Sequence, residues 1–331
     1  MKKPMGRKSL LALLLLALAG CGALLNNVTQ PILLGGEHHG PTRTSAQPVS
    51  AERLRQHVKK LSTEFIPRDH RHIDNLDAVA AYIQDELQQA GAKVHRQPYK
   101  VDGLTYSNVV AVFGPETTER IVIGAHYDAW GPHPGADDNA SGVAGLLELA
   151  RRLQGAKLKH RVELVAYTLE EPPYFRTAHM GSAVHARALK AEQARVKLML
   201  SLECIGYFSD QPDTQDYPLP GLGLLYPTTG NFVAVAGRFE DGALAKQVKN
   251  AMQSATPLPV YSINAPGFVT GIDFSDQLNY WAEGFPGLMV TDTAFYRNKR
   301  YHTAHDTFEH LDYSRMAQVV EGVVAAVVSI E

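Results

Sequence analysis

The chain of 331 residues has 32 basic and 34 acidic side chains, 45% hydrophobic residues and two cysteines. Two cysteines exclude a disulfide framework and a four-thiolate zinc site, and a charged fraction of 20% with a net charge of −2 argues against disorder and against non-specific nucleic-acid binding. A chain of this length can bury about 70–75% of its unfolded surface, which is enough for one large globular domain or two modest ones.

The N-terminus has the features of an export signal. Four basic residues precede an apolar Leu/Ala run at residues 10–19. As a helix this run spans about 15 Å, half of the ~30 Å bilayer core, so it is too short for a standard membrane anchor. Leu18-Ala19-Gly20-Cys21 resembles the bacterial lipobox, in which the cysteine carries the lipid. We therefore expect a lipoprotein signal peptide at 1–20 and membrane attachment through Cys21. The alternative is an ordinary secretory signal with an incidental cysteine.

This signal predicts a protein of the cell envelope, lipid-anchored on the extracytoplasmic side. Gly22 stands where an aspartate commonly retains lipoproteins at the inner membrane, which favours the outer membrane in a cell with two membranes. Residues 21–49 are rich in Gly, Pro, Thr, Gln and Asn without an apolar period, and this composition predicts a flexible tether. The folded domain is expected at 50–331, with no second domain boundary.

Hydrophobic periodicity predicts alternating helices and strands in this domain. Helices are expected from Ser50, at 76–90, 140–153, 181–193, 241–253 and 313–330. Strands are expected at 93–99, 107–113, 120–125, 161–168, 196–202, 232–235 and 287–291. Several of these strands are purely apolar, so the pattern predicts an α/β fold, a three-layer α/β/α sandwich around a mixed, mostly parallel sheet. The Pro/Gly-rich stretch 209–231 is expected to be an active-site loop.

Polar residues follow the apolar strands, where open α/β sheets bind ligands. The strand ending at Ala125 runs into His126-Tyr127-Asp128, and residues two apart on extended backbone face the same side. Asp128 can therefore fix the tautomer of a metal-bound His126. Taken alone, this pattern is more often a hydrogen-bonded loop histidine.

The next segment, Gly135-Ala-Asp-Asp-Asn-Ala-Ser-Gly142, leads into an apolar helix. Capping the helix needs one polar residue, whereas this segment supplies three. A third segment, the strand at 162–169, ends in Glu170-Glu171, and two such carboxylates repel each other unless a cation lies between them or the turn is solvated.

A further strand ends at Glu203, and His302 and His305 precede the last helix, where spacing alone permits either histidine as a ligand. Together these oxygen and nitrogen ligands, with no thiolate, suit zinc or another borderline divalent metal.

At this point the chain resembles metallopeptidase family 28 (clan MH), the co-catalytic zinc aminopeptidases, from about residue 50 to the end. The matching motifs are Gly124-Ala-His-Tyr-Asp128, Gly135–Gly142, Glu170-Glu171, Leu202-Glu-Cys-Ile-Gly206 and Tyr301-His-Thr303 with Asp306-Thr307. The resemblance implies that Asp137 bridges two Zn²⁺ ions per chain and forms a cis peptide bond with Asp138. It implies that His126 and Glu203 complete one site, that Glu171 and His302 complete the other, that Glu170 is the general base and that Asp128 orients His126.

The motifs depart from the family pattern in two places. The family more often has Asp where this chain has Glu203, and the usual Glu-Glu-x-Gly run is replaced by Glu170-Glu-Pro-Pro-Tyr-Phe175. Aromatic residues flank the motifs and are candidates either for a substrate pocket or for core packing: Tyr207, Phe208, Phe295, Tyr296 and Tyr301. Cys204 is expected to be a packed thiol.

The expected function is a zinc-dependent aminopeptidase that hydrolyses N-terminal residues of peptides through a metal-bridged water, with Glu170 as the base. Its expected partners are a peptide substrate and the membrane, without nucleic acid or an obligate protein partner. One alternative is a glutaminyl cyclase-like aminoacyltransferase with a single zinc. The other is a non-catalytic binding lipoprotein of the same fold.

Overall fold

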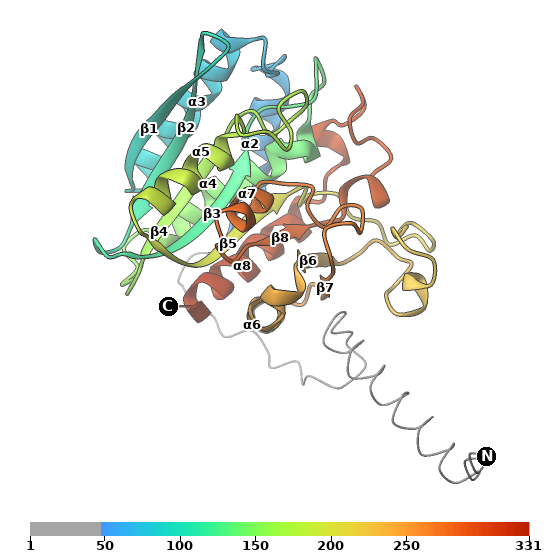
Figure 1. Ribbon diagram of the computed structural model, residues 1–331. Helices are drawn as coiled ribbons and strands as arrows, with labels where there is room; N and C mark the ends of the chain where they lie inside the picture. The colour runs from blue at the N-terminus through green and yellow to red at the C-terminus, as the bar shows by residue number, and fades with distance from the viewer. Residues whose placement is uncertain (1–47, 331) are drawn as a thin grey trace, which may run out of the picture.

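The computed structural model describes residues 48–330. The predicted signal peptide, Cys21 and nearly all of the predicted tether lie outside these residues. Within them, the chain forms one eight-stranded sheet with helices on both faces (Figure 1). The predicted three-layer α/β class is therefore confirmed.

The sheet is mixed, and its order is β1-β2-β4-β3-β5-β8-β6-β7. The strands are β1 (Lys93–Val101), β2 (Leu104–Phe113), β3 (Glu119–His126), β4 (Arg161–Tyr167), β5 (Arg195–Glu203), β6 (Val233–Gly237), β7 (Val260–Asn264) and β8 (Leu288–Thr291). The central run β4-β3-β5-β8 is parallel, as is the pair β6-β7. The pairs β1-β2, β2-β4 and β6-β8 are antiparallel. Because β4, β3 and β5 are parallel neighbours, their carboxyl ends meet at one edge of the sheet.

One face of the sheet is covered by α2 (Ala51–Thr63), α3 (Ile73–Gln89), α4 (Gly142–Leu153), α6 (Gly242–Ala255) and α8 (Tyr313–Ile330). The other face is covered by α5 (Gly181–Ala191) and α7 (Gln277–Ala282). Strand β3 shows why both faces are apolar. Ile121 and Ile123 pack into the larger core cluster, whereas Val122 packs with Leu189 of α5 in the second cluster. The 3-10 segments are η2 (Leu222–Leu224), η3 (Phe239–Asp241), η4 (Ala294–Tyr296) and η5 (Phe308–His310).

Helix termini follow local sequence signals. The Ser50 side chain accepts a hydrogen bond from the Arg53 amide at 3.2 Å and so caps the start of α2. The C-terminal helix α8 is apolar and long enough to cross a membrane by length and composition alone, but half of it is buried inside the fold. It packs against α2, α4 and α6, so its apolar surface serves the core.

Candidate active site

The predicted site residues gather at the carboxyl edge of the central strands. His126 is the last residue of β3, Glu203 is the last residue of β5, and Glu170 and Glu171 follow β4. His302 reaches the same edge from the loop before η5. Parallel pairing of β4, β3 and β5 thus brings together side chains that are distant in the sequence, such as His126 and Glu203, which are 77 positions apart.

Two triplets of ligand atoms share one aspartate, Asp138. In the first triplet, His126 Nε2 lies 3.3 Å from Asp138 Oδ1 and 3.3 Å from Glu203 Oε2. In the second, His302 Nε2 lies 2.9 Å from Asp138 Oδ2 and 3.3 Å from Glu171 Oε2. The ligand atoms of each triplet all lie within 4.8 Å of one another. Asp138 therefore presents one oxygen to each imidazole.

This arrangement corrects the expectation that Asp137 is the shared ligand. The Asp137 carboxylate points elsewhere, where it accepts hydrogen bonds from the Gly206 amide at 3.0 Å and from Asn298 Nδ2 at 2.9 Å. The backbone departs from helical geometry at Asp138 (φ −104°, ψ 93°), so these adjacent side chains point in different directions. The cis peptide joins Asp138 to Asn139, not Asp137 to Asp138.

Asp128 lies beside His126, as the motif predicts. Its carboxylate is 3.5 Å from His126 Nδ1, and its backbone carbonyl is 3.2 Å from the same nitrogen. The carboxylate also accepts hydrogen bonds from the backbone amides of Glu170 and Glu171, at 3.2 and 3.1 Å. Asp128 thus connects the end of β3 to the turn that presents both glutamates.

Glu203 accepts hydrogen bonds from two buried side chains. Ser275 Oγ donates a hydrogen bond to Glu203 Oε2 at 2.7 Å, and Ser201 Oγ lies 2.7 Å from Ser275 Oγ. Cys204 is fully buried, and its thiol donates to Glu203 Oε1 at 3.3 Å. Burial raises the pKa of this thiol well above its usual value, so Cys204 is a packed thiol and not a nucleophile.

Sequence reasoning missed Arg68. This residue lies in the loop between α2 and α3 and is fully buried. Its guanidinium donates to the backbone carbonyls of Tyr127, Leu61, Pro134 and Gly135. These bonds fix both ends of the loop between His126 and Asp138. An isolated arginine in a loop gives no pattern signal, so it can be found only once the loop is folded. Asp306, in contrast, lies in a recognised motif, and its carboxylate accepts the amides of both Asp137 and Asp138.

The electrostatics of the site favour a bound cation. Burial raises the pKa of Glu170 well above its usual value and that of Glu171 to about 7. Burial alone would lower the pKa of His302, but Asp138 and Glu171 raise it to about 10. Several ligand atoms are buried without a hydrogen-bond partner: His126 Nε2, His302 Nε2, Asp138 Oδ2 and Glu171 Oε1. Buried polar atoms normally have partners, so unpartnered nitrogen and oxygen atoms aimed at common points fit two divalent metal positions.

The structure separates the two candidate histidines. His302 belongs to the second triplet, whereas His305 is exposed and belongs to neither. Glu170 also belongs to neither triplet, although Glu170 Oε2 lies 3.8 Å from His126 Nε2. A carboxylate beside the ligands, but outside both sets, is positioned to exchange a proton with a reacting group.

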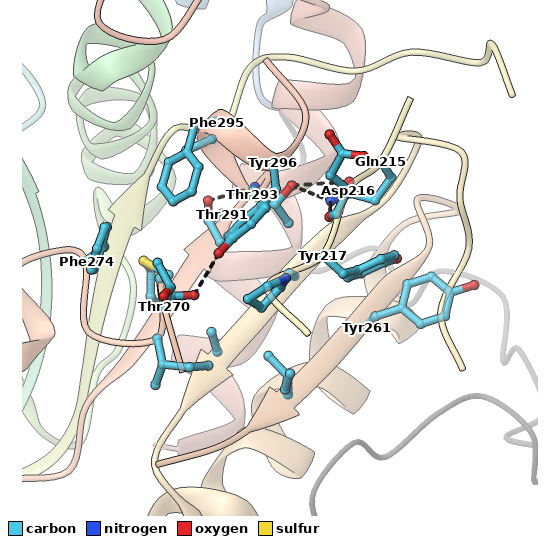
Figure 2. A pocket seen from close by; sticks show the side chains of 18 of the residues that line it. Gln215, Asp216, Tyr217, Tyr261, Thr270, Phe274, Thr291, Thr293, Phe295 and Tyr296 are labelled. Carbon is cyan, nitrogen blue, oxygen red and sulfur yellow. Dashed lines mark hydrogen bonds between the residues drawn. The ribbon is translucent and has the colours of Figure 1, made fainter. Parts of the chain in front are cut away.

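An apolar pocket of about 830 Å³, including its open mouth, adjoins Glu203 (Figure 2). Its floor is formed by small and apolar side chains of β6 and β8, and aromatic side chains surround it: Tyr217, Tyr226, Phe232, Tyr261, Phe274, Phe295, Tyr296 and Tyr301. Three of the five predicted aromatic residues therefore line the pocket, namely Phe295, Tyr296 and Tyr301. Tyr207 and Phe208 do not, and Phe208 is buried against Arg297. The loop 209–231 contributes to one wall through Gln215, Tyr217 and Leu222, as its predicted role requires.

Comparisons with known proteins identify relatives of the chain. The chain is 50% identical over 283 residues to the uncharacterized protein YfbL of Escherichia coli (strain K12), covering 83% of this chain and 87% of that protein. It is 29% identical over 247 residues to a probable leucine aminopeptidase of Trichophyton verrucosum (strain HKI 0517), covering 71% of this chain and 60% of that protein. The chain thus spans less than two thirds of the fungal relative.

Solved structures share the fold. The structure of BSAP, a zinc aminopeptidase from Bacillus subtilis, has a TM-score of 0.67 at 14% identity, covering 86% of this chain and 95% of that one. A glutaminyl cyclase from Bacteroides thetaiotaomicron has a TM-score of 0.64 at 18% identity, covering 86% and 99%. The model of peptidase family M28 matches residues 108–327, about two thirds of the chain. The chain therefore belongs to peptidase family M28 and is a metallopeptidase of the aminopeptidase type.

Proposed function

We propose that the protein is a two-zinc aminopeptidase that removes apolar residues from the N-terminus of peptides. The observation that carries this proposal is the position of Asp138, which presents one carboxylate oxygen to each of two imidazoles beside a large apolar pocket. His126 and Glu203 would hold one ion, Glu171 and His302 would hold the other, and Asp138 would be shared. Bound there, two zinc ions would supply polarisation of the scissile carbonyl and a lowered pKa for a water.

The residues of the chain carry the remaining steps. Glu170 accepts the proton of the attacking water and later delivers it to the leaving amine. Asp128 holds Glu170 in place through the Glu170 amide, at 3.2 Å, and keeps the His126 ring oriented. The pocket takes the side chain of the N-terminal residue, and the metal site would bind the substrate's free α-amine, which an acylated N-terminus lacks.

Glu170→Gln tests the catalytic assignment. The amide keeps the shape of the side chain but cannot accept a proton, so turnover should be lost while the zinc content stays at the wild-type value. A Glu170→Gln protein with a normal rate would exclude this residue as the base.

A substrate panel tests the exopeptidase assignment. Leucyl, phenylalanyl, alanyl and lysyl anilides should be cleaved only when the α-amine is free, with the apolar residues preferred. Cleavage of the N-acetylated forms at a similar rate would contradict the aminopeptidase proposal.

The glutaminyl cyclase alternative differs in metal number. A single zinc would need one complete triplet, whereas both triplets are complete among the described residues. Metal analysis of the purified protein separates the alternatives, since the proposal requires two zinc ions per chain. The absence of any hydrolysis by the zinc-loaded protein would favour the non-catalytic binding lipoprotein.

We also propose that the enzyme is lipid-anchored through Cys21 and acts outside the cytoplasm. The support is the basic and apolar N-terminal sequence that ends at the lipobox-like Leu18–Cys21 segment. Cys21→Ser should abolish incorporation of a labelled fatty acid and leave the uncleaved chain. Continued labelling of the variant would exclude Cys21 as the attachment point.

A further inference from the structure

The imidazole of His302 lies between two aromatic rings. The Trp130 ring stacks on it with a centroid distance of 4.9 Å and 6° between the planes, and the Tyr301 ring with 3.9 Å and 14°. Two rings parallel to the imidazole cannot share one of its faces without touching each other. Trp130 and Tyr301 make no ring contact with each other in the described part of the chain, so they lie on opposite faces of His302.

The two ligand histidines are restrained in different ways. His126 is fully buried, and its Nδ1 has the backbone carbonyl of Asp128 at 3.2 Å, the usual hydrogen bond that orients a metal-binding imidazole. His302 is 25% exposed, and no residue in the described range 48–330 forms a hydrogen bond with its Nδ1. It also lies in an irregular loop, with a backbone φ of 56°. Stacking is therefore the contact that sets the plane of this ring.

The loop that carries Trp130 is itself anchored. The Ala129 amide donates to the Arg68 carbonyl at 3.2 Å, and Arg68 Nε donates to the Tyr127 carbonyl at 3.0 Å. The Arg68 guanidinium also binds the carbonyls of Pro134 and Gly135 at the far end of the loop. The indole is thus presented to His302 from a fixed backbone, although Trp130 is 37% exposed.

We propose that Trp130 is a positioning residue for the second metal site, where ring stacking replaces the hydrogen bond that orients His126. The inference rests on the proposed two-zinc function. Trp130 is the informative ring of the pair because it lies outside the apolar pocket, whereas Tyr301 lines it. Changing Trp130 therefore alters the support of His302 without changing a side chain that lines the apolar pocket.

The test compares Trp130→Leu, which keeps apolar volume but removes the flat ring, with Trp130→Phe, which keeps a flat ring. Trp281→Phe is the control for zinc binding, since Trp281 is the other tryptophan, its indole donates to the Gly287 carbonyl, and it packs against the apolar cluster of Ala236 and Met289 rather than against His302. Zinc bound per chain is measured across a series of zinc-buffered solutions, and kcat and KM are measured at saturating zinc.

Trp130→Leu should bind its first zinc like the wild type and its second about tenfold more weakly, in the range of losses caused by removing an outer partner of a ligand. Trp130→Phe should restore the affinity for the second zinc, and Trp281→Phe should bind both zinc ions like the wild type. KM at saturating zinc should stay unchanged in the two Trp130 variants. Wild-type binding by Trp130→Leu, equal weakening of both sites, or no recovery in Trp130→Phe would each overturn the role. A wild-type protein that binds fewer than two zinc ions would instead overturn the proposed function.

Discussion

The assignment of the shared ligand to Asp138 can be tested by replacing the two adjacent aspartates separately. Asp138→Asn removes the charge that faces both His126 and His302, at 3.3 and 2.9 Å. Loss of a group that only hydrogen-bonds to a metal ligand lowers metal affinity by about 10- to 100-fold. Loss of the shared ligand itself should therefore lower the zinc affinity of both sites by more than about 100-fold. Zinc content and activity should fall together.

Asp137→Asn should behave differently. Burial raises the pKa of Asp137 well above its usual value, so a neutral amide is a close substitute for this carboxyl group. The amide keeps one oxygen and can keep one of the two hydrogen bonds, from Gly206 or Asn298. Loss of the other should lower the free energy of unfolding by about 1–3 kcal/mol while zinc stays bound.

The assay is metal analysis after dialysis in a fixed zinc buffer, combined with denaturant unfolding of the same samples. The reasoning fails if Asp137→Asn loses both zinc ions while Asp138→Asn retains them. It also fails if the two variants lose zinc to the same extent with equal unfolding free energies.

Three further predictions concern the pocket, the anchored loop and pH. Ala236→Leu, on the pocket floor, should lower kcat/KM for phenylalanyl substrates at least tenfold relative to alanyl substrates, and an unchanged ratio would contradict the pocket assignment. Arg68→Met should lower the free energy of unfolding by about 3–5 kcal/mol in denaturant titrations, because four backbone carbonyls lose their donor and three of these hydrogen bonds are buried; a loss below 1 kcal/mol would refute this role. In the metal-free protein, the pKa of His302 is raised from 6.5 to about 10, so its charge contributes stability that is complete below pH 6.5 and is lost as pH rises through about 10. His302→Gln should remove this part of the alkaline decline in melting temperature, and an identical decline in both proteins would exclude it.

The fold was predictable because its signals are local. The strand predicted at 120–125 spans Glu119–His126 in the structure. Its three consecutive β-branched residues, Ile121, Val122 and Ile123, strongly favour a buried strand over a helix. The short strand β7 (Val260–Asn264) was missed, because five residues at the edge of the sheet carry little periodic signal. Its pairing with β6 depends on contacts that form only in the folded sheet.

The site was predictable at the level of motifs but not at the level of single atoms. Parallel strands end in His126 and Glu203, and the strand between Arg161 and Tyr167 leads into Glu171, so the fold brings these three residues together at one edge of the sheet. The choice between Asp137 and Asp138 depends on the backbone torsions of one segment, which adjacent identical residues cannot reveal. The support from Arg68 and Trp130 comes from loops whose course only the tertiary structure determines.

The cluster of carboxylates around Asp138 makes the stability of the folded protein depend on the supply of zinc. Four acidic side chains meet there, namely Asp138, Glu170, Glu171 and Glu203. In the metal-free chain, burial already raises the pKa of Glu170 and Glu171. Each zinc ion that binds only the folded form adds about 2.7 kcal/mol of stability at a free concentration 100 times its dissociation constant. If the protein binds zinc as proposed, zinc starvation would raise the population of opened chains and with it the exposure of the chain to proteases. Zinc availability would then set the amount of enzyme as well as its activity.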